Sequence, residues 1–313
     1  MDISDYLDIS FVPEKRDNIW QLTDSPDIVT DGSGDKYIGY EYIGESYSGN
    51  RRYIIEERDR LTAKVIAELT GDGVFLDLAC GDGCLTVPCA ALGTKIIAGD
   101  ISNAMLKILR EKARSNGISL EKTALCRMNA LEIPLKNKCI DTEAANSVLH
   151  LISNPEKVIN EIYRVLKVGG SFVCVDDAPG KNNENQFDNS LYNEIVSRFY
   201  SEYWSELDGY GIAPRKFSWS FDRHACCAKI FADFETRKIS RGNTYKISLK
   251  DGFLPRFISR GFSDQVSVPQ DIHHKTIDFL LEKFAGIYGS NFADIEFVGI
   301  EDDLLITVYK RGV

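Results

Sequence analysis

Apolar and polar positions alternate between residues 54 and 177 in a way that predicts strands and helices in turn. Short apolar runs predict strands, and these runs fall at residues 74–80, 95–100, 124–130, 140–152 and 171–177. Apolar residues at helical spacing predict helices, and these lie at residues 54–69, 84–93, 102–117 and 154–170. Strands that alternate with helices are typical of βαβ units, so the pattern indicates a mostly parallel sheet.

Two of the predicted helices carry capping signals at their ends. Ser102 is a suitable N-cap for the helix that it opens, and Gly117 lies beyond the end of that helix. Asn154 can cap the last helix of the series, and Pro155 then occupies its first turn. These signals support helical boundaries close to residues 102 and 154.

The alternation stops after Asp177. Residues 187–291 predict mixed helix and strand, with a hairpin-like stretch around Gly242–Asn243 and a helix at 271–289, and two strands are predicted after them. We expect an α/β, doubly wound sheet with strands 1–5 parallel and a final antiparallel pair, interrupted by a mixed α+β cap. The expected domains are an N-terminal lid at residues 1–53, a core at 54–180 and 292–313, and a cap insertion at 181–291.

Composition narrows the class of protein. The 313 residues are 43% hydrophobic and 27% charged, as expected of a globular chain that buries a core. No run approaches the roughly 20 apolar residues that a membrane helix needs. The N-terminus, MDISDYLDIS, lacks the pattern of a secretory signal. We therefore expect a cytoplasmic protein with no membrane partner, and the sequence carries no signal for its oligomeric state.

The charge of the chain is negative overall but unevenly distributed. The net charge of −10 and the sequence pI of about 5.1 argue against a general affinity for nucleic acid. Between Pro214 and Arg260, however, eleven Lys and Arg residues face four Asp and Glu residues, a local charge of +7. This stretch is either a solvated positive face or a surface for anionic ligands.

The cysteines and histidines do not predict a metal site. None of the eight cysteines forms a Cys-x-x-Cys pair, which argues against a zinc ribbon and against a thioredoxin-type centre. Cys80, Cys84 and Cys89 are separated by gaps of three and four residues, and small core residues around a turn explain them best. His273 and His274 are neighbours on a predicted helix, so their side chains point in different directions.

The stretch LDLACGDGCL, residues 76–85, predicts a ligand-binding turn at the end of the first strand of the alternating series. Gly81 and Gly83 let the backbone approach a ligand closely. In open α/β sheets, ligands bind at the carboxyl ends of the strands. Asp100, at the end of the next strand, can accept hydrogen bonds from both hydroxyls of a ribose.

The residues around this turn favour one class of nucleoside ligand over others. A dinucleotide fingerprint would place a third glycine where Thr86 stands, and Asp77 and Asp82 would repel a pyrophosphate. The phosphate-binding Gly-Lys pattern is absent. A ligand with a ribose, no phosphate and a cationic group fits better, and S-adenosylmethionine is such a ligand.

Residues 74–177 resemble the class I S-adenosylmethionine-dependent methyltransferases. The similar segments occur in family order, and they are LDLACGDG, AGDIS, MNALEIPL, NSVLHLI and EIYRVLKVGGSFV. The resemblance implies a Rossmann-like core that binds S-adenosylmethionine and releases S-adenosylhomocysteine. Ala79 stands where the family more often has a glycine, and Asn129 stands where an aspartate is usual.

The resemblance also implies which residues hold the cofactor. Those expected around its methionine and ribose parts are Asp77, Ala79, Gly81, Gly83, Asp100 and Asn146. Those expected at the adenine are Ile101, Asn129, through its side-chain oxygen, and Ala130, through its backbone. Tyr47 is expected to close over the cofactor from the N-terminal segment.

Residues for the methyl acceptor are sought in the core and in the cap. His150 follows the fourth strand and is either a general base or a packed side chain. Residues 249–310 are similar to the C-terminal cap of small-molecule methyltransferases, several of which act on carboxylic acids. The guanidinium groups of Arg241, Arg256 and Arg260 could bind a carboxylate or a phosphate of a small-molecule acceptor.

Three other functions remain open from the sequence. An RNA methyltransferase would use the basic residues 214–260 to follow a phosphate backbone. A nicotinamide-dependent oxidoreductase is disfavoured by the missing third glycine. A non-catalytic regulatory module would bind S-adenosylmethionine without turning it over.

Overall fold

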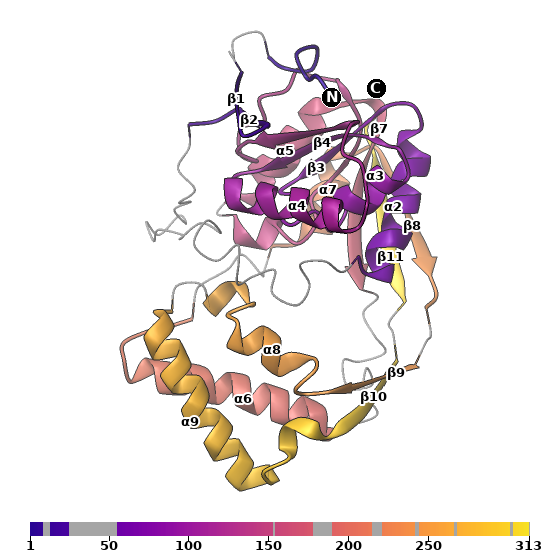
Figure 1. The fold of residues 1–313 in the computed structure, drawn as a ribbon. Coiled ribbons are helices and arrows are strands. Elements are labelled where there is room, and N and C mark those ends of the chain that lie inside the picture. Colours follow the sequence, from indigo (N-terminus) through magenta and orange to yellow (C-terminus); the bar gives the residue numbers. More distant parts are fainter. Residues whose placement is uncertain are drawn as a thin grey trace. The chain divides into compact units, whose positions relative to one another are not determined.

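The structure, a computed structural model, describes residues 1–8, 13–24, 55–152, 154–177, 190–214, 221–241, 244–265, 268–300 and 303–312. The chain divides into two compact units (Figure 1). The first unit contains residues 1–176, 217–237 and 305–313, and the second contains residues 177–216 and 238–304. Most of the predicted lid, including Tyr47, lies outside the described residues.

A parallel sheet forms the centre of the first unit. Its inner strands are β3 (Val74–Leu78), β4 (Lys95–Asp100), β5 (Thr123–Arg127), β6 (Ile140–Ala144) and β7 (Leu166–Asp177). Strand β3 pairs in parallel with β4 and with β6, so that Asp77 lies opposite Ala98 on one side and Ala144 on the other. Strand β4 pairs in parallel with β5, and β6 with β7. The predicted parallel sheet is confirmed, and the strand order reverses direction between β3 and β6.

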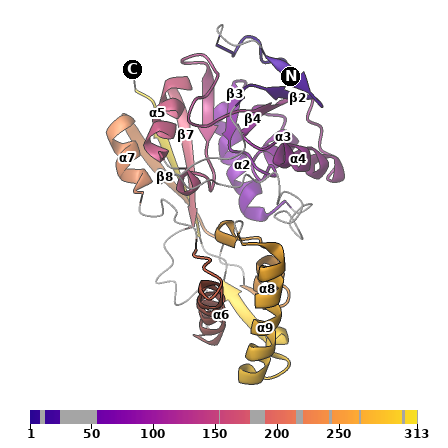
Figure 2. The same ribbon diagram turned by 90° about the vertical axis from the view of Figure 1, so that its left-hand side faces the viewer.

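Helices cover both faces of this sheet (Figure 2). One face carries α2 (Glu57–Thr70), α3 (Thr86–Ala91) and α4 (Asn103–Ser115), and the other carries α5 (Pro155–Val165) and α7 (Arg223–Ile230). The predicted caps are confirmed, because Ser102 Oγ accepts the Met105 amide at 3.3 Å and Asn154 Oδ1 accepts the Lys157 amide at 3.0 Å. Among the described residues, no helix is long and apolar enough to cross a membrane.

The first residues of the chain extend the sheet. Strands β1 (Glu14–Arg16) and β2 (Ile19–Gln21) form a hairpin, and β2 pairs in parallel with β5. Ile3, Leu7 and Leu22 are buried in the same core as the parallel strands. The described part of residues 1–53 therefore packs as part of the core, whereas the sequence predicted a lid. Three-residue strands carry too short an apolar pattern to be recognised from sequence.

The opposite edge of the sheet contains strands from distant parts of the chain. They are β11 (Leu304–Lys310), which lies next to β7, and β8 (Asp233–Ile239), which lies outside β11. The Ala232 amide donates to the Lys310 carbonyl, and the Thr236 and Thr307 hydroxyls are 3.2 Å apart, so β8 and β11 run antiparallel. The expected final antiparallel pair is present, but its members differ, because β8 replaces the strand predicted just before β11.

Residues 217–237 belong to the first unit, although the sequence placed them in the cap. The Phe231 ring stacks on Phe172 with ring centroids 5.8 Å apart, and Cys227 is fully buried in the same core. Helix α7, together with Phe231 directly after it, thus covers the sheet next to α5. The boundary at residue 181 agrees with the division into units to within a few residues, but the boundary at 291 does not.

The second unit contains helices packed around aromatic side chains, together with a small sheet. Its elements are α6 (Ser190–Asp208), β9 (Thr244–Ser248), α8 (Phe253–Ile258), η4 (Ser263–Gln265), α9 (Gln270–Tyr288), η5 (Phe292–Asp294) and β10 (Glu296–Ile300). Phe199 packs edge-on against Phe257 and Phe284, and all three rings are buried. Strand β9 pairs with β10 and not with β8, so the predicted hairpin around residues 242–243 is wrong.

One acidic side chain is buried in the middle of the parallel sheet. Glu143 of β6 is 0% exposed and lies opposite Leu76 and Phe172 of the neighbouring strands. Within the described residues, neither oxygen of its carboxyl group has a hydrogen-bond partner. Burial raises the pKa of Glu143 well above its ordinary value, and Cys174 and Asp77 raise it further. Burial therefore favours the protonated form of Glu143 in the folded protein.

We expect the substitution Glu143→Gln to remove part of the pH dependence of stability. As the pH rises above 4.5, the ordinary pKa of this group, the unfolded chain loses the proton while the folded protein keeps it. The free energy of unfolding then falls by about 1.4 kcal/mol per pH unit up to the folded-state pKa. Urea unfolding should show Glu143→Gln gaining stability relative to the unaltered protein as the pH is raised from 5 to 8.

Glu161→Gln is the matched control for this measurement. Burial raises the pKa of Glu161, but hydrogen bonds from Arg164 and the Ile133 amide lower it on balance. Its ionised form stabilises the fold above the ordinary pKa of 4.5, so this variant should cost the same stability at pH 5 and at pH 8 and cost less only at lower pH. An unchanged pH slope in Glu143→Gln would show that Glu143 is ionised in the folded protein.

Candidate functional site

The glycine turn follows β3 directly, at the carboxyl edge of the sheet where the strand order reverses. Ala79, Gly81 and Gly83 all have positive φ, at 56°, 53° and 83°. A Cβ added at Gly83 would lie 2.5 Å from Leu109 Cγ of α4, so this position requires glycine. Ala79 adopts a backbone conformation that glycine adopts more easily, which explains why glycine is commoner there in the resembling family.

Asp100 holds the turn from the end of β4. Its Oδ2 accepts the Gly81 amide at 2.8 Å, and its Oδ1 accepts the Ser102 amide at 2.9 Å. The side chain is buried, with 8% of the residue exposed. Each carboxylate oxygen has a second lone pair. Binding of ribose hydroxyls by Asp100 therefore stays a prediction, but its hydrogen bond to the turn is a contact that the sequence did not reveal.

Asp77 is more deeply buried than Asp100. The residue is 1% exposed, and Oδ2 accepts the hydroxyl of Thr86 at 2.5 Å. The pKa of Asp77 is raised to about 7, mainly by burial. The hydrogen bonds from Thr86 oppose this rise, and the charges of Asp100 and Asp59 add to it. Thr86 thus orients Asp77, although in the sequence it was notable only as the position where a third glycine is missing.

Four carboxylates lie in or near the turn, close enough to interact electrostatically with one another or with the thiol of Cys84. They are Asp59 of α2, Asp77, Asp82 and Asp100. The pKa of Cys84 is raised by burial first and then by Asp59, Asp82 and Asp77. Asp59 is 8% exposed and comes from a helix in which nothing in the sequence marked it. Such a surrounding favours a cationic ligand and opposes a pyrophosphate.

The remaining predicted cofactor residues lie on adjacent strand ends. The Met128 amide donates to the Asp100 carbonyl at 2.9 Å and so joins the segment that leads to Asn129 and Ala130 to β4. Asn129 Oδ1 accepts the Leu131 amide at 2.9 Å, so the oxygen expected to meet the adenine already has one donor. These contacts bring the proposed adenine side of the site next to Asp100.

Asn146 joins the end of β6 to the glycine turn. Its Nδ2 donates to Cys84 Sγ at 3.5 Å. The next residue, Ser147, has a positive φ of 55°. Ile101, on the other side, is half-buried, and its carbonyl accepts Arg127 Nε at 3.0 Å. Asn146 thus contacts the segment after the turn, and Ile101 follows Asp100 at the end of β4; their roles at the methionine part and at the adenine stay predictions.

His150 lies in the short helix η2 (Leu149–Leu151) after β6. It is half-buried, and burial lowers its pKa, so the imidazole is neutral at neutral pH. A neutral imidazole is the form that can accept a proton. The position is compatible with a general base, which stays a prediction.

The predicted substrate arginines belong to the second unit. Arg256 Nε donates to the Gly261 carbonyl at 3.3 Å, and its guanidinium lies 4.4 Å from the centre of the Phe262 ring. Arg260 has a positive φ of 59°, and burial lowers the pKa of its guanidinium. Arg241 is partly buried at the end of β8.

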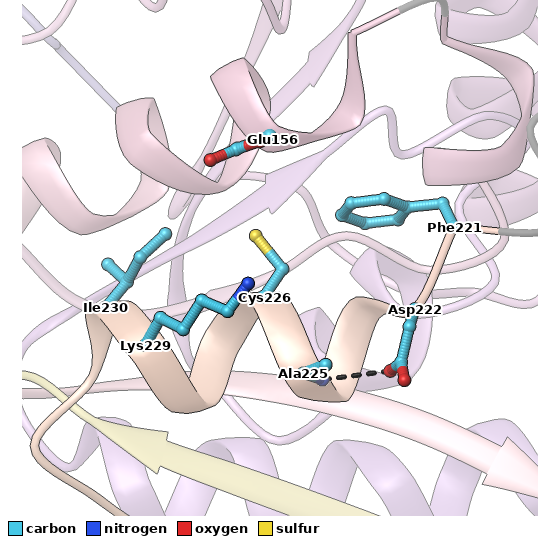
Figure 3. Close-up of a pocket in the computed structure, with 7 residues that line it drawn as sticks. All are labelled: Glu156, Phe221, Asp222, Ala225, Cys226, Lys229 and Ile230. Atoms are coloured by element: carbon cyan, nitrogen blue, oxygen red, sulfur yellow. Dashed lines mark hydrogen bonds between the residues drawn. The ribbon is translucent and has the colours of Figure 1, made fainter.

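A groove between α5 and α7 is lined by none of the predicted site residues (Figure 3). It has a volume of about 200 Å³ and is lined by Glu156, Phe221, Asp222, Ala225, Cys226, Lys229 and Ile230. Burial raises the pKa of the Cys226 thiol, Glu156 raises it further and Lys229 lowers it. A raised pKa lowers the share of the reactive thiolate form of Cys226 at neutral pH.

Comparison with known proteins places the core in a family. Residues 76–174 match the family model described as a methyltransferase domain. The demethylmenaquinone methyltransferase of Symbiobacterium thermophilum is 33% identical over 109 residues, which is 34% of this chain and 43% of that protein. The ubiquinone/menaquinone biosynthesis C-methyltransferase UbiE of Pectobacterium carotovorum is 33% identical over 104 residues, which is 32% of this chain and 41% of that protein.

A solved structure resembles the chain more weakly. The Haemonchus contortus phosphoethanolamine N-methyltransferase 2, in complex with S-adenosyl-L-methionine, gives a TM-score of 0.43 at 14% identity and covers 86% of this chain and 57% of that one. The chain spans about half the length of the curated relatives that it matches. On the family match, residues 76–174 are similar to a methyltransferase domain, in agreement with the resemblance to the class I S-adenosylmethionine-dependent methyltransferases. The predicted resemblance and α/β fold are thereby confirmed.

The hydrogen bond between Thr86 and Asp77 should make the effect of Thr86→Val depend on pH. The folded-state pKa of Asp77 is about 7, above the ordinary 3.8, so its contribution to the free energy of unfolding falls between about pH 4 and pH 7. Removing the Thr86 hydroxyl should raise the pKa of Asp77 further, so that the free energy of unfolding falls more as the pH rises. We expect Thr86→Val to cost about 2–3 kcal/mol at pH 8, where it unpairs a carboxylate, and about 1 kcal/mol at pH 5.

Thr70→Val is the control, because the hydroxyl of this buried threonine donates to the Ile66 carbonyl at 2.7 Å and faces no carboxylate there. Its cost, measured by urea unfolding at the same two pH values, should not change with pH. Equal costs of Thr86→Val at pH 5 and pH 8 would contradict a carboxyl that titrates near neutrality.

Proposed function

We propose that this protein transfers the methyl group of S-adenosylmethionine to a small-molecule acceptor. The observation that carries the proposal is the glycine turn itself, which is held by Asp100 and surrounded by carboxylates. The ligand that it suits has a ribose and positive charge, and S-adenosylmethionine carries an ammonium and a sulfonium. The methyltransferase-domain match over residues 76–174 supports the same reading.

The glycines of the turn and the two carboxylates beside it support the choice of this cofactor. Gly81 and Gly83 leave the backbone of the turn open to close approach, and the carboxylate of Asp100 is of the kind that accepts hydrogen bonds from ribose hydroxyls. Asp77 pairs with the ammonium, and this requires its ionised form. With a pKa of about 7, the affinity for the cofactor should rise as the pH increases through neutrality.

The chain's own residues act by positioning. The bound cofactor supplies a methyl group already activated by the sulfonium, so the protein has to orient the acceptor in line and exclude water. Asn146 lies where the acceptor and the methionine part meet. His150 removes a proton if the accepting atom carries one. A lower kcat with an unchanged KM in His150→Gln would support that role, and an unchanged kcat would contradict it.

The acceptor is proposed to be recognised by the second unit, with an anionic group as the main determinant. Arg260 supports this because its guanidinium is partly buried in a turn of fixed conformation. A planar guanidinium binds carboxylates in bidentate fashion. The relatives named for demethylmenaquinone give a second acceptor class, a quinone, which the acceptor assay below includes.

An RNA acceptor is less well supported. The basic stretch 214–260 is divided between the two units. Within its described part, several cations form ion pairs with carboxylates. These pairs are Arg237 with Glu68 and Glu235, Lys238 with Asp303, Lys246 with Glu296, and Lys250 with Asp294. Paired cations release fewer counterions to a phosphate backbone, so a steep salt dependence of RNA binding is not expected.

Calorimetric titration with S-adenosylhomocysteine tests the cofactor. We expect binding with a micromolar Kd by the unaltered protein, a Kd weaker by about tenfold or more for Asp100→Ala, and no heat with NAD. Asp72→Ala is the control, because Asp72 is exposed and lies before β3, away from the turn. Binding of NAD in place of S-adenosylhomocysteine would overturn the proposed function.

An acceptor assay tests the anionic determinant and separates an enzyme from a regulatory module. S-adenosylhomocysteine release is measured with a panel of carboxylic acids and with demethylmenaquinone. With a carboxylate acceptor, Arg260→Met should raise KM by about tenfold or more and leave kcat nearly unchanged. Turnover of demethylmenaquinone with the same KM in both proteins would assign the quinone class. Cofactor binding without turnover of any acceptor would favour the regulatory module.

A further inference from the structure

A buried lysine of α4 forms an ion pair with the glycine turn. Lys112, in the last turn of α4, is 2% exposed, and its Nζ lies 3.3 Å from Asp82 Oδ2, between Gly81 and Gly83. Within the described residues, Asp82 is the one ion-pair partner of Lys112. A buried ammonium is costly unless it is paired, so the pair constrains the position of Asp82.

Two further residues of the same helix face support the turn. Leu109 occupies the space that a Cβ at Gly83 would need, and Met105 Cε lies 3.5 Å from the Cβ position of Gly81. Met105, Leu109 and Lys112 are spaced by four and three residues, so they share one face of α4. Residues 81 to 83 therefore all lie beside this face of α4.

The turn is thus held from two sides. Asp100 binds the Gly81 amide from the end of β4, and Lys112 binds the Asp82 carboxylate from α4. The ion pair also neutralises Asp82. The negative charge presented to a ligand then comes from Asp59, Asp77 and Asp100, which are not paired with Lys112.

We propose that Lys112 is a positioning residue of the cofactor site, whose ion pair with Asp82 holds the turn from Gly81 to Gly83 in its binding conformation. The effect on the cofactor rests on the proposed function, whereas the effect on the turn does not. Without the pair, the binding conformation is one of several that the turn adopts. The observed affinity then falls in proportion to the fraction of molecules in that conformation.

The test compares Lys112→Met with the double variant Asp82→Asn/Lys112→Met. Lys112→Met leaves Asp82 unpaired but near solvent, at 18% side-chain exposure, so we expect it to fold. Amide hydrogen exchange of Gly81 and Gly83 should become about tenfold faster, and the Kd for S-adenosylhomocysteine should weaken about tenfold. In the double variant, stability should recover while fast exchange and weak binding remain, because the charges balance but the link is missing.

Lys107→Met is the control, since Lys107 lies on the same helix, is exposed and pairs with Asp17 far from the turn. It should change neither exchange nor affinity. Unchanged exchange and affinity in Lys112→Met would overturn the proposal, as would their recovery together with stability in the double variant. If the unaltered protein binds no S-adenosylhomocysteine while Lys112→Met still speeds exchange, the proposed function fails and the positioning of the turn by Lys112 stands.

Discussion

The two hydrogen bonds that Asp100 accepts are the contacts on which the rest of the site depends. They join the amide of Gly81, at the end of β3, to the amide of Ser102, which opens α4. The bond to Gly81 can form because β3 and β4 pair in parallel and end at the same edge, with Leu78 opposite Gly99. The carboxylate is thus both a structural link and a ligand candidate. A change at Asp100 therefore alters the turn as well as any direct contact with a nucleoside.

Local patterns predicted the centre of the fold because its elements are long enough to show a period. Ser102 and Asn154 could be recognised as caps from the chain alone, since a cap depends on neighbours three residues away. The edges of the sheet could not be predicted in this way. The position of β8 next to β11 depends on packing of Phe231 against Phe172 and Tyr309, residues separated by up to about 140 positions. No local signal carries such a contact.

The candidate site likewise contains some residues that could be predicted from the sequence and others that could not. Asp77, Gly81, Gly83 and Asp100 could be predicted because the turn and the two strand ends are adjacent in sequence or follow from parallel pairing. Their partners could not be predicted, because Asp59, Thr86 and Lys112 belong to three different helices. In the sequence, Thr86 was notable only because a glycine is missing there. The hydrogen bond from its hydroxyl to Asp77 matters because Asp77 is buried. The missing third glycine could argue against a dinucleotide from the sequence alone. The partner of the Thr86 hydroxyl can be identified only from the packed structure.

The place of β11 in the sheet has a consequence for how the protein is made. Strand β11 is synthesised after β7 and β8, yet it lies between them in the sheet. Until residues 304–310 emerge, the growing chain must keep the edge of β7 unpaired, and exposed edges promote association with other strands. All of the second unit is synthesised during that interval. A chain that stops before residue 304 would therefore lack an interior strand, and its sheet would keep an open edge that favours aggregation.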